Sequence, residues 1–378
     1  MRKALIISPT FNEEGNIDKL IRQIFEQQTK TSIWELHVLI VDSNSTDKTA
    51  QKVKLLQKKY HFLHLLETPK EGLGKAYMQG FAYGLEKINA YVIFEIDADL
   101  SHDPNDIPRF LKKIEEGADF VVGSRYMKGG SIPDNWGLHR KFLSIFANLI
   151  VKLGFMKLKV TEWTNGYRAI KAWIIKDSFD YLKNYSGYVF QIAFLDYALK
   201  HNAKEVEIPI HFKDRISGIS KINAFQYIFN TLLYVLLNSD FIKFVVVGFI
   251  GFAVDFSFAY SFINFFHISK AIANMLSAEI AIIFNFLLNN FWSFRHKKII
   301  GGTFAYIKKF ITFNLVSSGS ILIQGIGIFL ALKFIGDKVI HVTSFGISSW
   351  IIYKVLLIAC VIIPYSYILY NKFIWKEK

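Results

Sequence analysis

The chain has 378 residues, of which 52% are hydrophobic, and a formal net charge of +14. Its length allows two or three domains, and its one cysteine, Cys360, excludes an intrachain disulfide and a metal site built from several cysteines. A basic balance suits nucleic acid, an anionic membrane or phosphorylated substrates, but no nucleic-acid-binding motif accompanies it, so we expect membrane and phosphate as partners and no nucleic acid.

Residues 1 to about 235 alternate short apolar runs with amphipathic segments. Apolar runs predict strands at 4–8, 36–41, 62–66, 91–96 and 119–122, the first of them broken by Pro9. Helical spacing of apolar residues predicts helices at 17–28, 46–59, 74–88 and 104–116. This alternation predicts a Rossmann-like α/β fold, with a mostly parallel sheet covered by helices on both faces.

Polar clusters follow three of these strands, at residues 10–13, 42–47 and 97–99. Ligands of such sheets bind at the carboxyl ends of the strands, so the clusters predict a site at one edge of the sheet. Asn and Asp also cap helices, and for Asn12 and Asp47 capping is an equally good interpretation.

Asp97 and Asp99 favour a more specific interpretation, because two carboxylates this close repel each other. A divalent cation removes the repulsion, since Mg²⁺ and Mn²⁺ prefer carboxylate oxygens and bridge to substrate phosphates. The ion then neutralises the charge of a departing diphosphate. The pair therefore predicts a divalent cation, Mg²⁺ or Mn²⁺, as the cofactor.

The segment Pro9-Thr-Phe-Asn-Glu13, the Asp42 cluster and Asp97-Ala-Asp99 together resemble the inverting glycosyltransferases of family 2, which have the GT-A fold. A longer set of motifs resembles the dolichyl-phosphate (polyprenyl-phosphate) mannose synthases of that family. It comprises residues 97–104 (DADLSHDP), 123–126 (GSRY), 164–169 (TNGYRA), 187–191 (GYVFQ) and 215–221 (RISGISK). The resemblance covers residues 3 to about 225.

The resemblance implies a role for each matching residue. Those implied in nucleotide binding are Pro9, Phe11, Glu13, Val41, Asp42, Ser43, Asp97, Ala98 and Asp99, and those implied as metal ligands are Asp97, Asp99 and Ser101. Three positions depart from the family's pattern. Ser101 stands where some relatives have Gln, and Ser43 where many have a second Asp. Ala193 stands where some relatives have an acid, with Asp196 nearby on the same expected helix. A hydroxyl is a poorer ligand than an amide oxygen, so a water can intervene between Ser101 and the metal.

Two phosphorylated substrates must meet in such an enzyme, so basic residues are needed to overcome their repulsion. The residues expected to carry the reaction are Asp99, Arg125, Arg140, Arg215 and Lys221. For any one of the basic residues, a solvated surface charge is the alternative, and residues 214–221 are expected to form a mobile loop that closes over the donor.

The reaction requires little acid–base catalysis by the protein. A phosphate monoester oxygen is already anionic at neutral pH, so the enzyme must supply positioning and charge stabilisation rather than a strong base. His102 is the histidine nearest to the motifs, and we interpret it as structural or supporting. One direct displacement at the anomeric carbon predicts inversion and a β-linked product.

Four apolar runs follow, at 241–262, 270–291, 308–335 and 347–371, each close to or above the length that crosses a bilayer as a helix. The loop between the second and third runs, together with the first two residues of the third, carries five basic residues and no acid: Arg295, Lys297, Lys298, Lys308 and Lys309. This loop and both ends of the membrane region are therefore predicted to face the cytoplasm. The first residues are too short an apolar stretch for a signal peptide. We therefore expect a multi-pass protein of the cell membrane with a cytoplasmic catalytic domain.

The membrane half contains an internal sequence repeat. The repeat predicts that the four helices form two hairpins, which arose by one duplication. Its Lys243-Phe-x-x-Val-Gly248 pattern and the Asn-rich segment 285–294 resemble the GtrA-like membrane family. Residues 222–237 are expected to form a helix in the membrane interface. The predicted domains are a GT-A domain at 1–220, an interfacial helix or linker at 221–240, and a GtrA-like four-helix transmembrane domain at 241–378.

Taken together, these features predict transfer of mannose from GDP-mannose to a polyprenyl or dolichyl monophosphate, giving a β-linked mannolipid and GDP. UDP-glucose as the donor stays open, because pockets in this family differ by few residues. A different class of protein, a glycolipid flippase with a regulatory front domain, is disfavoured by the complete acidic and basic set. Whether the membrane half binds the acceptor or only anchors the enzyme also stays open.

Overall fold

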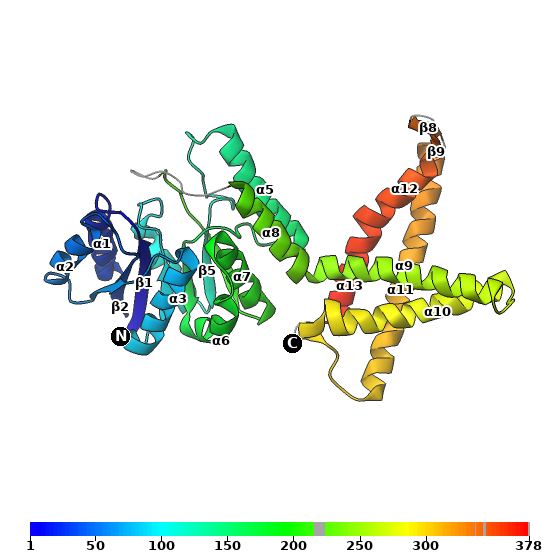
Figure 1. The fold of residues 1–378 in the computed structure, drawn as a ribbon, viewed down its shortest axis with the longest axis horizontal. Coiled ribbons are helices and arrows are strands. Elements are labelled where there is room, and N and C mark those ends of the chain that lie inside the picture. The colour runs from blue at the N-terminus through cyan, green and yellow to red at the C-terminus, as the bar shows by residue number, and fades with distance from the viewer. Residues whose placement is uncertain (215–223, 337, 343–344, 377–378) are drawn as a thin grey trace. The chain divides into compact units, whose positions relative to one another are not determined.

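The computed structural model describes residues 1–214, 224–336, 338–342 and 345–376 (Figure 1). The chain folds as two compact units, Met1–Val235 and Leu236–Lys378. The first is an α/β unit that carries the polar motifs, and the second contains the long apolar helices. Arg215 and Lys221, two of the predicted catalytic residues, lie outside the described residues.

A seven-stranded sheet forms the centre of the first unit, with the strand order β3-β2-β1-β4-β6-β5-β7. Its strands are β1 (Arg2–Thr10), β2 (Trp34–Asp42), β3 (Leu63–Glu67), β4 (Val92–Glu95), β5 (Phe120–Ser124), β6 (Arg168–Lys171) and β7 (Glu205–Pro209). Among these seven strands, β6 alone runs antiparallel to its neighbours. The prediction of a mostly parallel sheet is therefore confirmed.

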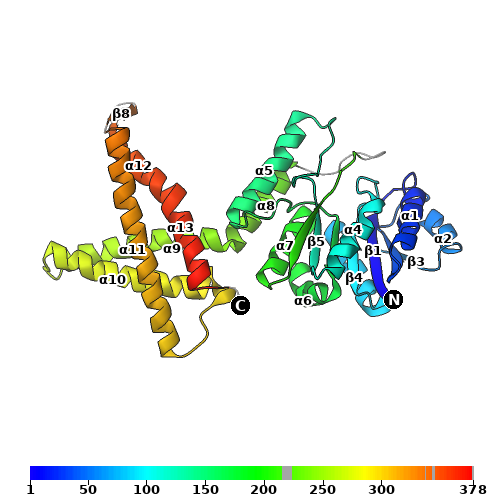
Figure 2. The same cartoon turned by 180° about the vertical axis from the view of Figure 1, so that it is seen from behind.

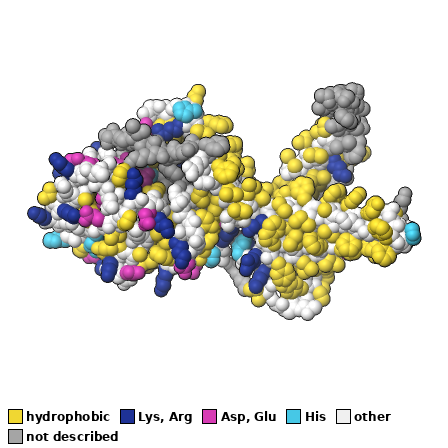
Figure 3. Space-filling view, in the orientation of Figure 1, with side chains coloured by type: hydrophobic (Ala, Val, Ile, Leu, Met, Phe, Trp, Pro, Cys, Tyr) yellow, Lys and Arg dark blue, Asp and Glu magenta, His cyan; other side chains and the backbone are white. Residues whose placement is uncertain are grey.

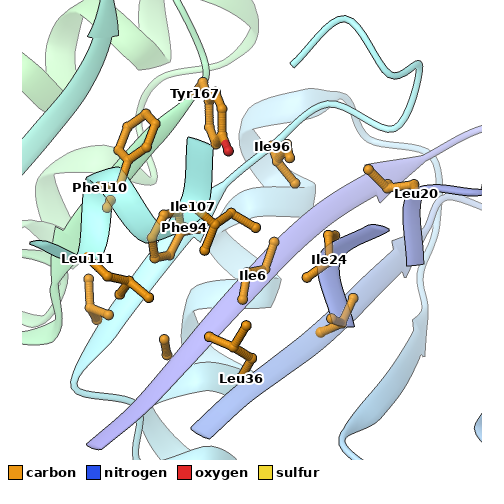
Figure 4. Close-up of a cluster of buried hydrophobic side chains, with 14 of the residues drawn as sticks. Ile6, Leu20, Ile24, Leu36, Phe94, Ile96, Ile107, Phe110, Leu111 and Tyr167 are labelled. Carbon is orange, nitrogen blue, oxygen red and sulfur yellow. The ribbon is translucent and has the colours of Figure 1, made fainter. Parts of the chain in front are cut away.

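Helices cover both faces of the sheet (Figures 1 and 2). On one face, α1 (Ile17–Glu26) and α4 (Ile107–Glu115) pack on alternate strand residues such as Ile6 and Phe94 (Figure 4). On the other face lie α3 (Leu73–Tyr83) and α7 (Gly187–Lys200), with Phe81 and Phe194 in edge-to-face contact. The remaining helices of this unit are α2 (Thr49–Gln57), α5 (Leu138–Gly154), α6 (Ala172–Leu182) and α8 (Ala224–Asn238).

The strands and helices predicted for the first 124 residues are present, with ends that differ by a few residues. The expected break at Pro9 is wrong, because β1 continues to Thr10. Pairing between β1 and β4 ends at Ile7, whereas pairing with β2 continues to Thr10. Beyond Ile7, β1 therefore has a neighbour on one side only, and a strand edge of this kind accommodates proline.

The second unit is built from helices whose apolar side chains are mostly exposed, as Figure 3 shows for the face in view. Its helices are α9 (Asp240–Asn264), α10 (Lys270–Leu288), α11 (Thr303–Phe334), α12 (Ser349–Leu357) and α13 (Ile363–Phe373), and a short hairpin of β8 (Val339–Val342) and β9 (Phe345–Ser348) follows α11. Four segments of the described chain are long and apolar enough to cross a bilayer: Asp240–Asn264, Met275–Ser293, Thr303–Phe334 and Ile352–Phe373. The chain is a membrane protein.

Polar side chains join the helices of the second unit where small residues allow close approach. In this unit α9 packs on α10, and a side chain at Gly251 would collide with Asn285. Asn290 is buried at the end of the first pair, where its Oδ1 accepts hydrogen bonds from the Ile299 N–H and from the Trp375 indole N–H. The Asn290 amide therefore connects the basic loop at 294–300 with the residues that follow α13.

A histidine pair on the sheet of the first unit, buried His37 and half-buried His64, predicts how the stability of this unit depends on pH. His37 Nε2 donates to Glu35, so His37 Nδ1 accepts from His64 Nε2, and His64 Nδ1 accepts from the Tyr83 hydroxyl. Burial, and then the nearby His37, lower the pKa of His64 below its ordinary value of 6.5. Because the fold favours neutral His64, its contribution is complete above about pH 6.5 and is lost as the pH falls through the lowered pKa.

We therefore expect the thermal unfolding midpoint of the first unit to fall between pH 7.5 and pH 5, and to fall less in a His64→Gln variant. Tryptophan fluorescence during heating measures this, with exposed His61→Gln as the control. Equal pH slopes for the wild type and His64→Gln would show that His64 does not contribute.

Candidate active site

The loops that follow β1 and β2 are joined at the carboxyl edge of the sheet. The Thr10 hydroxyl donates to Asp42 Oδ1 at 3.0 Å, and the Ser43 N–H donates to the Thr10 carbonyl oxygen at 2.9 Å. Asp42 is buried and also accepts from the backbone N–H and the hydroxyl of Ser45. These bonds make one rigid corner from two loops that lie 32 residues apart in the sequence.

Asn12 and Asp47 serve this corner rather than a helix end alone. Asn12 has φ of 61°, a conformation that Asn tolerates, and its side chain accepts from the Thr46 N–H at 2.8 Å. Asp47 accepts from the N–H groups of Thr49, the first residue of α2, and of Glu14, so it joins the start of α2 to the first loop. Burial raises the pKa of Asp47, but these hydrogen bonds outweigh it and lower the pKa.

The other predicted nucleotide-binding residues of the first two loops lie around this corner. Val41 and Ser43 are buried, whereas Pro9, Phe11 and Glu13 are partly exposed. The Lys70 ammonium lies 3.5 Å from the centre of the Phe11 ring, a cation–π contact that the motifs did not point to.

The turn that follows β4 carries the two aspartates. The Asp97 side chain is 39% exposed, Asp99 is partly exposed, and Asp99 Oδ1 accepts from the Ser101 N–H at 3.0 Å. Leu100 has φ of 63°, which is costly for a bulky residue. Backbone strain of this kind concentrates at functional sites, where the surrounding structure maintains it.

The donor atoms of this turn fit a hard divalent cation. The Ser101 hydroxyl is buried and has no hydrogen-bond partner among the described residues, and carboxylate oxygens lie two and four residues before it. The described residues include no group of three His, Cys, Asp or Glu side chains that could hold a metal by themselves. Diphosphate oxygens and water would complete the coordination, as is usual for Mg²⁺.

Arg125 does not extend freely from its glycine-rich loop. Its guanidinium makes two hydrogen bonds to Glu162, at 2.8 and 2.9 Å, and a third to the Thr164 hydroxyl, and its side chain is 9% exposed. Burial lowers the pKa of Arg125, but the Glu162 carboxylate outweighs it and raises the pKa; burial raises the pKa of Glu162, but Arg125 outweighs it and lowers the pKa. Both groups are therefore charged at neutral pH.

Arg140 lies at the start of α5 and is more accessible. Its guanidinium stacks 3.9 Å from the centre of the Trp136 ring and pairs with Asp214 at 3.3 Å. Phe212 joins the two arginines, because it contacts Trp136 edge-on and lies under the Arg125 guanidinium. Arg125 and Arg140 thus contact one aromatic pair, Phe212 and Trp136, and Phe212 lies on the segment that precedes residues 215–223.

Arg168 and Glu95 form a buried pair of charged residues beneath the site that the motifs did not reveal. They face each other across the β4–β6 pairing, and Arg168 donates to the carbonyl oxygens of Trp163, Asn165 and Gln191. Burial raises the pKa of Glu95 to about 7, against the opposing effect of Arg168. In the sequence Glu95 ends the apolar strand β4 and Arg168 begins β6, and only the pairing of these strands brings the two residues together.

The exposed apolar side of α5 is a second feature that the motifs missed. Its exposed side chains include Leu138, Phe142 (64% exposed), Ile145, Phe146, Leu149 and Leu153. α8 runs beside it (Figures 1 and 2), with Gly154 against Val235. The Tyr234 hydroxyl donates to the buried Asp196 of α7, so α8 is fixed to the first unit while Phe229, Leu232 and Leu233 stay exposed.

Comparison with known proteins identifies two regions of the chain. Residues 5–181 match the family model described as glycosyl transferase family 2, and residues 243–375 match the one described as GtrA/DPMS, transmembrane domain. The first match contains the sheet-edge loops, and the second contains the four apolar spans. The predicted GT-A fold with a four-helix membrane region is confirmed.

Two curated relatives match much of the chain. A dolichol-phosphate mannosyltransferase of Pyrococcus furiosus is 29% identical over 358 residues, which cover 91% of this chain and 96% of that protein. A polyprenol monophosphomannose synthase of Mycolicibacterium smegmatis is 33% identical over 59% of this chain and 82% of its own length. Among solved structures, a glucosyl-3-phosphoglycerate synthase of Mycobacterium tuberculosis covers 62% of this chain and 79% of its own, with 17% identity and a TM-score of 0.45.

Proposed function

We propose a reaction for this chain, which belongs to glycosyltransferase family 2 and is a hexosyltransferase of the dolichol-phosphate mannosyltransferase type. It transfers mannose from GDP-mannose to a polyprenyl monophosphate, and it releases GDP. An oxygen of the lipid phosphate forms the new bond to the anomeric carbon while the bond from that carbon to the GDP oxygen breaks. The direct displacement inverts an α-linked donor to a β-linked mannolipid.

The observation that carries this proposal is the turn from Asp97 to Ser101 at the same sheet edge as the Thr10–Asp42 corner. Asp97 and Asp99 would hold the divalent cation, with Ser101 as a direct or water-bridged ligand, and the bound cation would neutralise the diphosphate. Base and ribose would lie along the first two loops, against Pro9, Phe11, Glu13, Val41, Asp42 and Ser43, with Ala98 beside the ribose. Both relatives are a mannosyltransferase or a phosphomannose synthase, which supports mannose as the sugar.

The basic residues divide into two kinds by their surroundings. Arg140 is 39% exposed and pairs with Asp214, a contact that an incoming phosphate can replace. Arg125 is held by Glu162, so it would act as a fixed positive charge that needs no reorganisation when the substrates meet. Arg215 and Lys221 are proposed as further phosphate ligands from their motif alone.

The acceptor would reach this site from the membrane. Lipid phosphate lies at headgroup level, so the enzyme has to present its site there while the lipid tail stays in the bilayer. We propose that α5 and α8 lie in the interface with their exposed apolar side chains toward the lipid, extending the interfacial segment 221–240 predicted from the sequence. The basic residues of the loop between the second and third spans support our proposal that the catalytic unit faces the cytoplasm at the cell membrane.

The function is tested with the purified full chain in detergent, a polyprenyl phosphate, Mn²⁺ or Mg²⁺, and radiolabelled GDP-mannose or UDP-glucose in parallel. We expect a lipid-soluble product from GDP-mannose alone, lost with excess EDTA, whose anomeric carbon–proton coupling in NMR identifies the β anomer. A glucolipid formed from UDP-glucose would support the proposed reaction type but contradict GDP-mannose as the donor. An α-linked product would overturn direct displacement, and the absence of any product would favour the flippase.

The proposed role of α5 gives a separate prediction. Replacing Phe142, Phe146 and Leu149 together by Gln is expected to raise the apparent KM for a long-chain polyprenyl phosphate in vesicles roughly tenfold. The substitution removes three apolar side chains that are proposed to insert into the membrane interface. The KM for a short, water-soluble isoprenyl phosphate should stay unchanged. Leu55→Gln, on the exposed side of α2, is the control. An equal rise for both acceptors would contradict the interfacial role.

A further inference from the structure

His102 lies where the loops of the proposed site meet. It is 1% exposed, it stacks on the Tyr167 ring at 5.0 Å between ring centres, and it contacts Phe212 edge-on at 5.5 Å. Its ring is therefore fixed between two aromatic side chains, and its two nitrogens can serve only the partners in their own plane.

The hydrogen bonds of His102 define a single tautomer. The Asp97 backbone N–H lies 3.2 Å from Nδ1 and can only donate, so Nδ1 is the acceptor. Nε2 then carries the proton and donates to Asn165 Oδ1 at 2.8 Å. The Asn165 amide donates in turn to the Gly123 carbonyl oxygen, which sets the orientation of that amide.

This chain of hydrogen bonds connects three loops that are distant in sequence. It runs from the aspartate turn after β4, through the loop before β6, to the end of β5 immediately before Arg125. The segment that enters residue 214 is attached to the same point, because the Lys213 N–H donates to the Ser101 carbonyl oxygen and Phe212 contacts the imidazole. A displacement of His102 would therefore move the Asp97–Asp99 turn and the end of β5 before Arg125 together.

We infer that His102 is a positioning residue that holds the Asp97–Asp99 turn, through the Asp97 N–H, in the geometry that binds the metal and the nucleotide diphosphate. The inference deepens the proposed function and depends on it for the identity of the ligand. It assigns the imidazole no contact with substrate and no proton transfer. Supporting partners of metal ligands typically change metal affinity 10- to 100-fold when they are replaced.

Two substitutions test the roles of the two imidazole nitrogens separately. The amide oxygen of His102→Asn falls near the position of Nδ1 and can still accept from the Asp97 N–H, whereas His102→Gln extends toward Asn165 and leaves that N–H without an acceptor. His64→Gln, at a half-buried and hydrogen-bonded histidine away from the site, is the control. Thermal unfolding of each variant checks that any effect does not follow from general loss of stability.

The first measurement is Mn²⁺ binding by electron paramagnetic resonance with GDP present, without acceptor or turnover. We expect His102→Gln to weaken binding about tenfold, and His102→Asn and His64→Gln to stay within about threefold of the wild type. Equal weakening in both His102 variants, in proportion to lost thermal stability, would reduce His102 to a structural residue. Unchanged binding in His102→Gln would overturn the inference.

The second measurement does not depend on the ligand. Hydrogen exchange of a peptide containing Asp97 should be faster in His102→Gln than in His102→Asn, because only the former loses the acceptor for that N–H. If the wild type binds no Mn²⁺–GDP, the proposed function fails on its own, and the exchange rates alone decide the positioning role. Equal exchange in the two variants would overturn it.

Discussion

Replacing Asp99 by Asn is expected to lower sugar transfer by about a hundredfold to a thousandfold, the range seen when one charge-stabilising group is removed from an active site. Asn keeps a carbonyl oxygen at the position that accepts from the Ser101 N–H, so the turn should keep its shape. The substitution removes one carboxylate charge, and with it the attraction for the divalent cation that would stabilise the leaving diphosphate. The fold should remain, because Asp99 is partly exposed.

Initial rates at saturating GDP-mannose, over a wide range of Mn²⁺ concentrations, measure the effect. We expect a higher Mn²⁺ requirement together with a lower maximal rate, and an unchanged thermal unfolding midpoint. Asp180→Asn on α6, an exposed aspartate paired with Lys183, is the control and should be fully active. An Asp99→Asn enzyme that keeps more than a tenth of the rate at saturating Mn²⁺ would contradict the role proposed for this carboxylate.

The first half of the α/β unit could be predicted from the sequence because burial there follows a simple pattern. Each buried strand is one apolar run, and each run ends at a turn with polar residues, as Val41 precedes Asp42 and Ile96 precedes Asp97. Parallel strands then bring these ends to one edge without further information. The prediction at Pro9 was wrong because a strand can contain proline where it lacks a neighbour on one side. This depends on where β4 stops pairing with β1, which the local sequence does not show.

The later half could not be predicted in the same way, because its decisive contacts are distant in sequence. Arg125 follows a strand end and looks like a free phosphate ligand, but its partner Glu162 lies 37 residues away, beyond α5. β6 enters the sheet antiparallel between β4 and β5, and this places Arg168 opposite Glu95. α5 was missed because its apolar residues suit a buried helix equally well, and only the fold shows that they are exposed.

Replacing Glu162 by Ala is expected to destabilise the first unit by about 3–5 kcal/mol, because it leaves the Arg125 guanidinium buried without its partner. Glu162 is fully buried, and its carboxylate also accepts from the N–H groups of Thr164 and Asn165. For a unit of this size that cost lowers the unfolding midpoint by roughly 6–20 °C. The double variant Arg125→Met with Glu162→Leu should lose much less stability, since apolar replacement of both partners removes the uncompensated charge.

The double variant separates the structural contribution of the pair from the proposed contribution of Arg125 to catalysis. Heating curves followed by tryptophan fluorescence give the stabilities, and Glu116→Ala at an exposed ion pair is the control, which should not move the midpoint. We expect the double variant to fold and to retain Mn²⁺–GDP binding. It should transfer sugar at about a hundredth of the wild-type rate or less, because it lacks the fixed positive charge that we propose Arg125 supplies to the phosphorylated substrates. A double variant that folds and transfers sugar normally would show that Arg125 only supports the loop that contains Thr164.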